Sequence, residues 1–221
     1  MADSPAVSSE ERSADVPEEV REAVAAVRAA LPLTAGRCIL REARADDAAA
    51  LHAYRSDPEV TRFLGEPPLD REGVVDLLRR WRDDPAAVSV VTELSEGAGP
   101  SELAGQVVGD VRVRFRPASA LAPATTSAVD AAIGYAFHPA ARGQGLATES
   151  VRAVLEAVGA ARARRVTARV FAPAAPSSRL LARLGFTRDG VDRAAVLAPD
   201  GSQWWDDELW SLLLPDDGGR P

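Results

Sequence analysis

The sequence predicts an α+β fold in which helices flank a central mixed, mostly antiparallel β-sheet. Two valine-rich segments, residues 88–94 and 106–115, follow one another with no helical pattern between them, which is typical of antiparallel strands. A strand, a glycine-rich turn, a helical pattern and a second strand then occupy residues 131–170, and this order predicts one parallel crossover. Antiparallel neighbours followed by a single crossover give a mixed sheet.

The chain opens with a segment whose composition predicts disorder. Residues 1–16 are acidic and rich in serine and alanine, and they contain no aromatic residue. Pro17 then begins a helix that Pro32 ends, with one apolar stripe at spacings of four, three and four residues: Val20, Val24, Val27 and Leu31. We expect this stripe to pack on the protein's own surface, and docking of a partner is the alternative.

Three regions follow from this organisation. The N-terminal extension spans residues 1–33, the folded domain residues 34–215 and the C-terminal tail residues 216–221. With 221 residues, the chain is long enough for one domain with a sizeable hydrophobic core.

The folded domain begins with a short strand and two helices. The strand is expected over residues 38–41, and Asp46 or Asp47 can cap the helix that follows as far as Arg55. A second helix is expected over residues 69–81, because its apolar side chains share one face.

The remaining elements are read from alternation, periodicity and turn residues. The strand at residues 106–115 alternates between apolar and arginine side chains, and a Pro/Ala/Ser/Thr-rich stretch between Pro117 and Val129 predicts a mobile loop. Gly185 is expected to end a helix, and Asp200-Gly201 predicts a hairpin. In order, the expected elements are strand 131–138, helix 146–159, strand 165–170, helix 177–184, and strands 193–198 and 203–213.

Residue types that are missing exclude several kinds of chemistry. All 26 basic residues are arginines, so no lysine can form a Schiff base or complete a Walker-type phosphate loop. His52 and His138 are far apart and there is one cysteine, so we expect no metal site. No Gly-x-Ser-x-Gly elbow accompanies these histidines, which argues against a serine hydrolase.

Charge and hydrophobicity limit the partners and the compartment. A net charge of -7 argues against nucleic acid and is compatible with an amine substrate. No apolar run approaches the roughly 20 residues that cross a bilayer, and no secretory signal is recognisable, so we expect no membrane partner. The sole cysteine, Cys38, has no partner for an intrachain disulfide, and the cytoplasm is the expected location.

The turn after the 131–138 strand has the properties of an anion site. Gly143 and Gly145 allow the backbone to bend and to approach a ligand closely. The helix that starts at Leu146 points unpaired N–H groups and its dipole at the turn, and Arg142 adds a cation whose fork suits phosphate. These residues alone predict a site for a diphosphate-sized anion, with a plain turn before a helix as the alternative. A dinucleotide fold is disfavoured, because Thr148 replaces the third glycine of its motif.

This turn, Arg142-Gly-Gln-Gly-Leu-Ala147, resembles motif A of the GNAT acetyltransferase superfamily. The resemblance extends from about residue 34 to residue 214 and is greatest to the RimJ/RimL-like branch of ribosomal-protein N-acetyltransferases. Further matches occur in the right order: Ile39-Leu-Arg41, Ser56-Asp-Pro-Glu-Val60, Ile133-Gly-Tyr135, Gly145-Leu-Ala-Thr-Glu149, and Ser177, Arg179 and Leu184-Gly-Phe186. Several separated matches are more specific than any one of them.

The resemblance implies a GNAT fold that binds acetyl-CoA, without a metal, in a gap where strands 131–138 and 165–170 splay apart. The pantetheine arm would bond the backbone of the first strand and the turn would hold the pyrophosphate. The cofactor-binding residues implied are Phe137, His138, Arg142, Gly143, Gln144, Gly145, Leu146, Ala147 and Thr148. The implied reaction is direct attack of a primary amine, on a protein N-terminus or a small molecule, with no acyl-enzyme.

The catalytic residues match the family less well. Ser177 is the candidate that would bond or protonate the sulfur of CoA, and an N-cap of the following helix is the equal alternative. Ala174 stands where the branch usually has an asparagine, Leu181 where many members have a tyrosine, and Ala132 where the branch often has a glutamate.

The general base stays open among Asp110, Asp130 and water. Both aspartates are more simply interpreted as surface or turn carboxylates. Near the C-terminus, Trp204 and Trp205 adjoin three acidic residues, which suits either a cationic acceptor or aromatic packing with acids at its rim.

Two other functions remain as alternatives. The departures from the family pattern are compatible with a CoA-binding module that has lost catalysis. A nucleotide-binding regulator is the third possibility. A homodimer is compatible with the sequence and is not predicted by any pattern in it.

Overall fold

The computed structural model describes residues 16–97, 103–118 and 128–215. Its helices are α2 (Glu18–Ala30), α3 (Ala48–Arg55), α4 (Pro58–Thr61), α5 (Arg71–Arg82), α6 (Leu146–Ala160) and α7 (Ala175–Arg183), with 3-10 turns η1 (Ala45–Asp47) and η2 (Pro139–Ala141). Its strands are β1 (Leu33–Ala35), β2 (Cys38–Glu42), β3 (Ala87–Leu94), β4 (Val107–Pro117), β5 (Val129–Phe137), β6 (Ala163–Phe171), β7 (Thr187–Leu197) and β8 (Trp204–Leu213). Nearly all of the predicted leader, most of the loop between Pro117 and Val129, and the tail lie outside the described residues.

All eight strands belong to one sheet, in the order β1-β2-β3-β4-β5-β6-β8-β7. Neighbouring strands are antiparallel throughout, except for β5 and β6. The exception arises because α6 returns the chain to the end of the sheet where β5 began, so β6 runs in the same direction. The predicted α+β fold with a mixed, mostly antiparallel sheet is confirmed.

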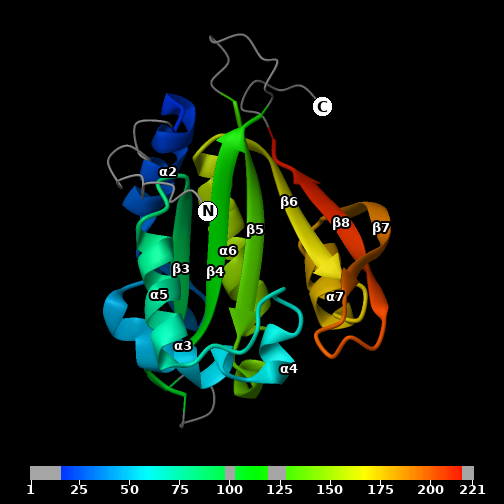
Figure 1. Cartoon of the computed structure of the whole chain (residues 1–221). Coiled ribbons are helices and arrows are strands. Elements are labelled where there is room, and N and C mark those ends of the chain that lie inside the picture. The colour runs from blue at the N-terminus through cyan, green and yellow to red at the C-terminus, as the bar shows by residue number, and fades with distance from the viewer. Residues whose placement is uncertain (1–15, 98–102, 119–127, 216–221) are drawn as a thin grey trace, which may run out of the picture.

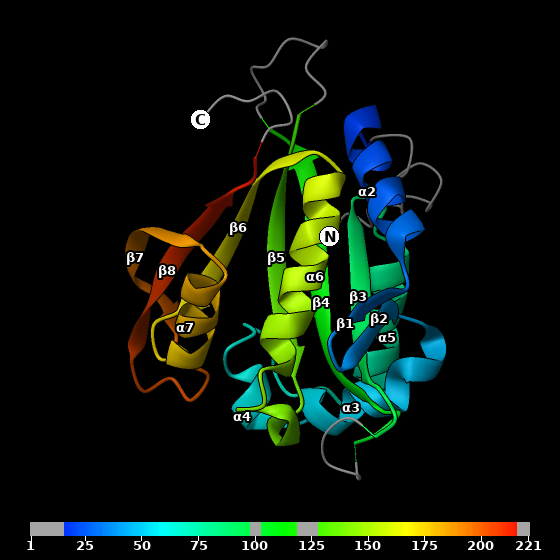
Figure 2. The same cartoon turned by 180° about the vertical axis from the view of Figure 1, so that it is seen from behind.

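Helices cover both faces of this sheet. Figure 1 shows α3, α4 and α5 in front of it, and Figure 2 shows α2, α6 and α7 on the opposite face. The apolar stripe of α2 is buried in the same cluster as α6 and strand β4, through Val20, Val24 and Val27. Because each fully buried valine contributes roughly 1.5–3 kcal/mol, this helix packs firmly on its own protein, as expected.

The parallel pair β5–β6 comes apart after a short paired stretch. Its register runs from Val129 opposite Ala163 to Ala132 opposite Thr167 and stops there. Beyond this point β6 pairs with β8 on its other edge as far as Phe171, while β5 pairs with β4 as far as Phe137. The predicted splay is therefore confirmed, and the two strands diverge visibly in Figure 1.

Two predictions about these elements are corrected, a strand boundary and a helix cap. Strand β7 begins at Thr187 and not near residue 193. Its side chains are mostly exposed on both faces, so it lacks the alternation that reveals a strand. Pairing with β8, with two register shifts, holds it in place. Asp47 does not cap α3: its carboxylate accepts the Arg44 N–H at 2.7 Å and bonds of 2.7 and 3.0 Å from Arg41.

Two general searches cover only the described parts of the chain. No helix there is both long enough and apolar enough to cross a membrane. No group of three or more histidine, cysteine or acidic side chains there could hold a metal ion.

Candidate functional site

The splay between β5 and β6 opens a cavity of about 930 Å³. Its walls come from the second half of β5 (residues 133–137) and of β6 (residues 168–171), the turn before α6, helix α7 over most of its length, Asp207 of β8, and α4 with the segment that follows it. Segments far apart in the sequence thus meet at one site. The cavity is large enough for an extended, drug-sized ligand.

The turn before α6 has the bend that the sequence predicts. Gly143 and Gly145 have φ angles of 73° and 81°, a left-handed conformation that side chains with a Cβ rarely adopt. Gly145 is also the N-cap of α6, and no side chain caps this helix. Within the described residues, the N–H groups from Gly143 to Thr148 make no hydrogen bond to the rest of the chain. Six consecutive free donors at a helix N-terminus form an anion site.

The side chains of this turn differ in where they point. Arg142, Gly143, Gly145, Ala147 and Thr148 line the cavity. The Leu146 side chain is fully buried in the core, and the Gln144 side chain donates to the Ala140 carbonyl at 2.8 Å. Leu146 and Gln144 can therefore contribute to a ligand only through the main chain.

The edge of β5 also offers free main-chain groups. His138 donates its N–H to the Val108 carbonyl at 2.8 Å, and hydrogen-bonded pairs alternate along an antiparallel ladder. The main-chain groups of Ile133, Tyr135 and Phe137 therefore face the gap. The His138 N–H is already used in this way and its carbonyl accepts the Ala141 N–H at 2.9 Å, so the predicted backbone bond from His138 would need the second lone pair of that carbonyl.

Ser177 lies in the first turn of α7 and lines the cavity. The helix begins at Ala175 with Ala174 as its N-cap, so the interpretation of Ser177 as the N-cap is wrong. Its hydroxyl lies beside the Tyr135 phenol, whose pKa a side-chain hydrogen bond with Ser177 acts to lower. Both hydroxyl groups belong to residues of the cavity wall.

A tyrosine that the sequence analysis gave no role lies beside Ser177. Tyr135 donates its O–H to the Ser177 carbonyl over a long 3.4 Å, and it also lines the cavity. Burial raises the pKa of Tyr135 to about 12, so the phenol is neutral at physiological pH. Its place on β5 differs from the position that the resemblance suggested, Leu181, a buried residue of α7 that lines the same cavity. The signal that could have found it is the alternation of β5, which puts Tyr135 on the α7 side.

Neither candidate aspartate is a surface carboxylate, so that interpretation is wrong. Asp110 is 1% exposed and accepts bonds of 2.7 Å from the Tyr54 hydroxyl and 2.6 Å from Arg55. Asp130 is 2% exposed and pairs with Arg164 at 2.9 Å, at the end of β5 that is still paired with β6. Neither residue lines the cavity. Neither carboxylate therefore reaches the cavity directly, and the general base stays open between water alone and an aspartate that acts through water.

The aromatic and acidic cluster of β8 divides between surface and cavity. Trp204 is exposed, whereas Trp205 packs with its ring centroid 5.8 Å from Phe63 and 6.2 Å from Phe171. Asp207 is buried, lines the cavity and accepts a 2.7 Å bond from Arg169. Trp205 thus takes part in aromatic packing, one of the two interpretations of this cluster. Asp207 lies in the interior and not at the rim of that packing, where this interpretation placed the acids.

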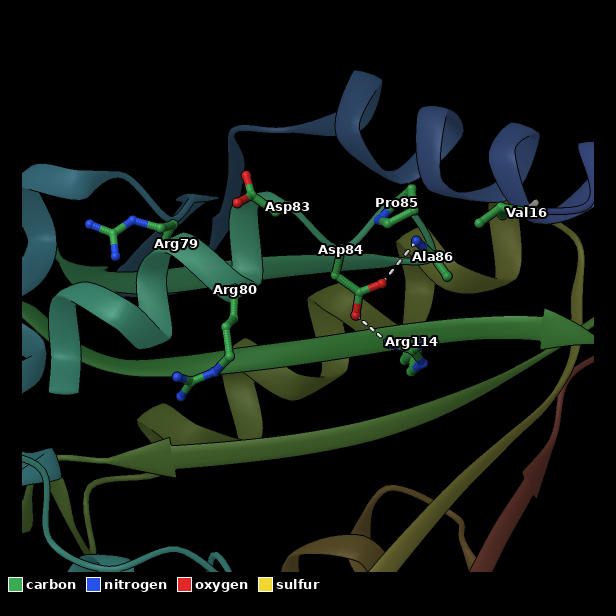
Figure 3. A pocket seen from close by; sticks show the side chains of 8 residues that line it. All are labelled: Val16, Arg79, Arg80, Asp83, Asp84, Pro85, Ala86 and Arg114. Atoms are coloured by element: carbon green, nitrogen blue, oxygen red, sulfur yellow. Dashed lines mark hydrogen bonds and ion pairs between the residues drawn. The ribbon is translucent and has the colours of Figure 1, made fainter. Parts of the chain in front are cut away.

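A second cavity of about 420 Å³ lies beside the end of α5, away from the turn (Figure 3). Its central acid, Asp84, accepts hydrogen bonds from Arg112 and Arg114 on β4 and from the Ala86 N–H. Figure 3 shows Arg80 pointing away from this carboxylate. Asp84 is therefore committed to joining α5, β3 and β4, and we assign no chemistry to this cavity.

A splayed parallel pair beside a two-glycine anion turn is the architecture expected of an enzyme that binds an acyl-CoA thioester. The sequence profile described as "Acetyltransferase (GNAT) domain" matches residues 37–187, which is most of the chain. The chain therefore belongs to the GNAT acetyltransferase family, as its motifs predicted.

Individual relatives agree with this assignment. The uncharacterized N-acetyltransferase YnaD of Bacillus subtilis (strain 168) is 24% identical over 187 residues, which cover 82% of this chain and 96% of that protein. RimL, a ribosomal L7/L12 alpha-N-protein acetyltransferase solved with coenzyme A, has a TM-score of 0.67 at 17% identity, over 83% of this chain and 97% of its own.

A third relative acts on a small amine. Spermidine N-acetyltransferase from Vibrio cholerae, solved with CoA and spermine, has a TM-score of 0.64 at 14% identity, over 80% of this chain and 95% of its own. At these identities the solved structures establish the shared fold.

Proposed function

We propose that the protein transfers the acetyl group of acetyl-CoA to a primary amine in a ternary complex, without an acyl-enzyme. One observation carries the proposal: the six N–H groups from Gly143 to Thr148 are unpaired within the described residues, at a turn before α6 that lines the cavity. The diphosphate of CoA is the anion that we assign to them, with Arg142 as an additional cation. RimL and the spermidine enzyme, both solved with CoA, support this assignment.

The pantetheine arm is proposed to lie along the free edge of β5. There the main-chain groups of Phe137 and Tyr135 would bond it in the way that an added strand is bonded. This path leads from the turn toward Ser177 and places the thioester near its hydroxyl.

The acceptor is proposed to enter from the other face of the sheet, over Gly134. A Cβ built on Gly134 meets nothing within 4 Å, and Phe63, Leu64 and Phe171 line the cavity on this side. The amine nitrogen would attack the thioester carbonyl carbon. As the C–N bond forms and the C–S bond breaks, a proton passes from nitrogen to water. The Ser177 hydroxyl donates a hydrogen bond to the leaving thiolate, which then takes up a proton from water.

Two acceptor classes are compatible with this cavity: a protein N-terminus and a small polyamine. Release of free thiol from acetyl-CoA, measured with N-terminal peptides and with polyamines, tests the proposal and separates the two. CoA binding without turnover on any amine would favour the module that has lost catalysis. Stronger thermal protection by ATP than by CoA would favour the nucleotide-binding regulator.

The cytoplasm is the compartment that we propose. The one cysteine, Cys38, is buried and unpaired, which suits a reducing compartment. Cell fractionation checks this assignment.

Replacing Ser177 by alanine is expected to lower kcat by about 10- to 100-fold, because the leaving thiolate loses the hydroxyl that we assign to it. The Kd for CoA should change less than about twofold, because the diphosphate contacts stay intact. Steady-state kinetics and calorimetry measure the two quantities. Ser178→Ala is the matched control, since Ser178 is on the same helix but bonds Glu208 at 2.7 Å. Equal kcat values in both variants would contradict a role of Ser177 in stabilising the leaving thiolate.

Gly134→Val is expected to raise the KM for the acceptor by about 10-fold, because the new side chain fills the acceptor side of the cavity. The Kd for CoA should stay unchanged, and the fold should tolerate valine, which favours strands. Gly190→Val on β7 is the control, since its Cβ also has room, 3.9 Å from Leu209, outside the cavity. An unchanged KM in Gly134→Val would show that the amine approaches elsewhere.

A further inference from the structure

The turn between β1 and β2 reaches across the fold to the start of α6. Arg37 Nη2 donates to the Gln144 carbonyl at 2.5 Å and to Glu149 Oε1 at 2.7 Å. The Arg37 backbone N–H donates to Glu149 Oε2 at 3.2 Å. A Cβ on Gly36 would lie only 2.7 Å from the same oxygen, so this turn is closely fitted to the carboxylate.

The bond to the Gln144 carbonyl determines where the next N–H group points. A trans peptide is planar, with its C=O and N–H directed to opposite sides. Because Arg37 holds the Gln144 carbonyl, the Gly145 N–H points away from Arg37, and Gly145 lines the cavity. One of the six free donors is therefore oriented by a residue more than 100 positions earlier in the chain.

Arg37 also compensates a charge that opposes anion binding. Glu149 is in the first turn of α6, close to the N–H groups of the turn. Burial acts to raise the pKa of Glu149, but hydrogen bonds from Arg37 outweigh it and leave this pKa lowered. The carboxylate is thus ionised at neutral pH. Without Arg37, its negative charge would repel a phosphate bound at the same helix end.

We infer that Arg37 is a positioning residue of the anion site: it orients the Gln144–Gly145 peptide and neutralises Glu149, so that the turn can accept a diphosphate. The inference rests on the proposed function, because the diphosphate it concerns is that of CoA. Arg37 itself does not line the cavity, and it acts through the main chain of the turn.

The test replaces Arg37 by methionine, which keeps the length of the side chain and removes its donors and charge. The Kd for CoA, measured by calorimetry, should rise by about 10-fold, as expected when a charged hydrogen bond is lost. Activity with S-acetylpantetheine, which has no diphosphate, should keep its kcat/KM within about twofold, while kcat/KM for acetyl-CoA falls by about 10-fold. Arg37→Lys should recover part of the affinity for CoA, because it restores the positive charge.

Two controls separate this role from a general loss of stability. Arg28→Met removes a similar pair, Arg28–Glu42 at 2.9 Å, whose side chains are 37% and 45% exposed against 38% and 31% for Arg37–Glu149. It should leave the affinity for CoA unchanged. Glu149→Gln should weaken CoA binding by less than about threefold, because Arg37 keeps the Gln144 carbonyl and one negative charge is gone.

Several results would overturn the inference. The first is an unchanged Kd for CoA in Arg37→Met. The second is an equal loss of kcat/KM with acetyl-CoA and with S-acetylpantetheine in that variant. The third is an equal loss of affinity for CoA in Arg37→Met and in Glu149→Gln. The proposed function fails differently: the wild-type protein itself would then not bind CoA.

Discussion

Replacing Gly145 by valine is expected to weaken CoA binding by roughly 100-fold. The φ angle of 81° at this position costs a residue with a Cβ about 1–3 kcal/mol, and relaxation of that strain turns the neighbouring N–H groups away from the diphosphate. A Cβ would also lie 3.8 Å from Arg37 Nη2 and 3.9 Å from Glu149 Oε1, so the larger valine side chain presses on the contact that orients the turn. Calorimetric titration with CoA measures the effect.

Gly201→Val is the matched control for this prediction. Gly201 has a similar φ of 70°, and a Cβ there meets nothing within 4 Å. It lies between β7 and β8, outside the cavity, so its variant carries the same backbone strain without touching the turn. If both variants lost stability equally and only Gly145→Val lost affinity for CoA, the loss of affinity would be due to the anion site. Unchanged affinity in Gly145→Val would contradict the assignment of the diphosphate to this turn.

The sequence was most informative where a local pattern has one physical explanation. Two glycines before an apolar helix predicted the left-handed bend, because only such residues adopt it without strain, and φ angles of 73° and 81° confirm it. The periodicity of valine predicted the strands and α2, because apolar side chains at regular spacings share one buried face. Strand β7 was underestimated because both of its faces are exposed, so its pairing with β8 and not its own pattern keeps it extended.

These local patterns did not predict contacts between segments that are distant in the sequence. The 2.7 Å bond between Arg37 and Glu149 joins a residue outside every quoted motif to the last residue of the Gly145–Glu149 motif, and no local pattern connects the two. Asp110 was interpreted as a surface or turn carboxylate because carboxylates are mostly exposed. Its burial follows from Tyr54 and Arg55, on a helix more than 50 residues earlier, whose donors satisfy the carboxylate. Such hydrogen bonds between distant residues depend on the tertiary fold and leave no local pattern in the sequence.

Arg55 and Asp110 form a buried ion pair whose charge balance can be tested directly. The side chains are 7% and 2% exposed, and the Tyr54 hydroxyl donates a further bond to the same carboxylate. Burial alone would lower the pKa of Arg55, but the charge and hydrogen bonds of Asp110, together with the charges of Tyr54 and Glu66, outweigh it and leave this pKa raised. The guanidinium therefore stays charged inside the protein, and its stability depends on the aspartate.

Asp110→Asn is expected to lower the free energy of unfolding by about 3–5 kcal/mol, because it leaves a buried arginine without its principal counter-charge. Asp130→Asn on neighbouring β5 is the control. Asp130 is equally buried, but its partner Arg164 is 49% exposed and can turn to water, so we expect a loss of about 1 kcal/mol or less. Urea unfolding followed by circular dichroism measures both.

The same variants decide whether Asp110 acts in catalysis. If its role is structural, Asp110→Asn should keep kcat at temperatures where it is folded, since the carboxylate lies outside the cavity. Combining it with Arg55→Met should restore part of the lost stability, because the buried charge is then absent as well. A variant with normal stability and no turnover would instead make Asp110 the general base, acting through water from its place on β4.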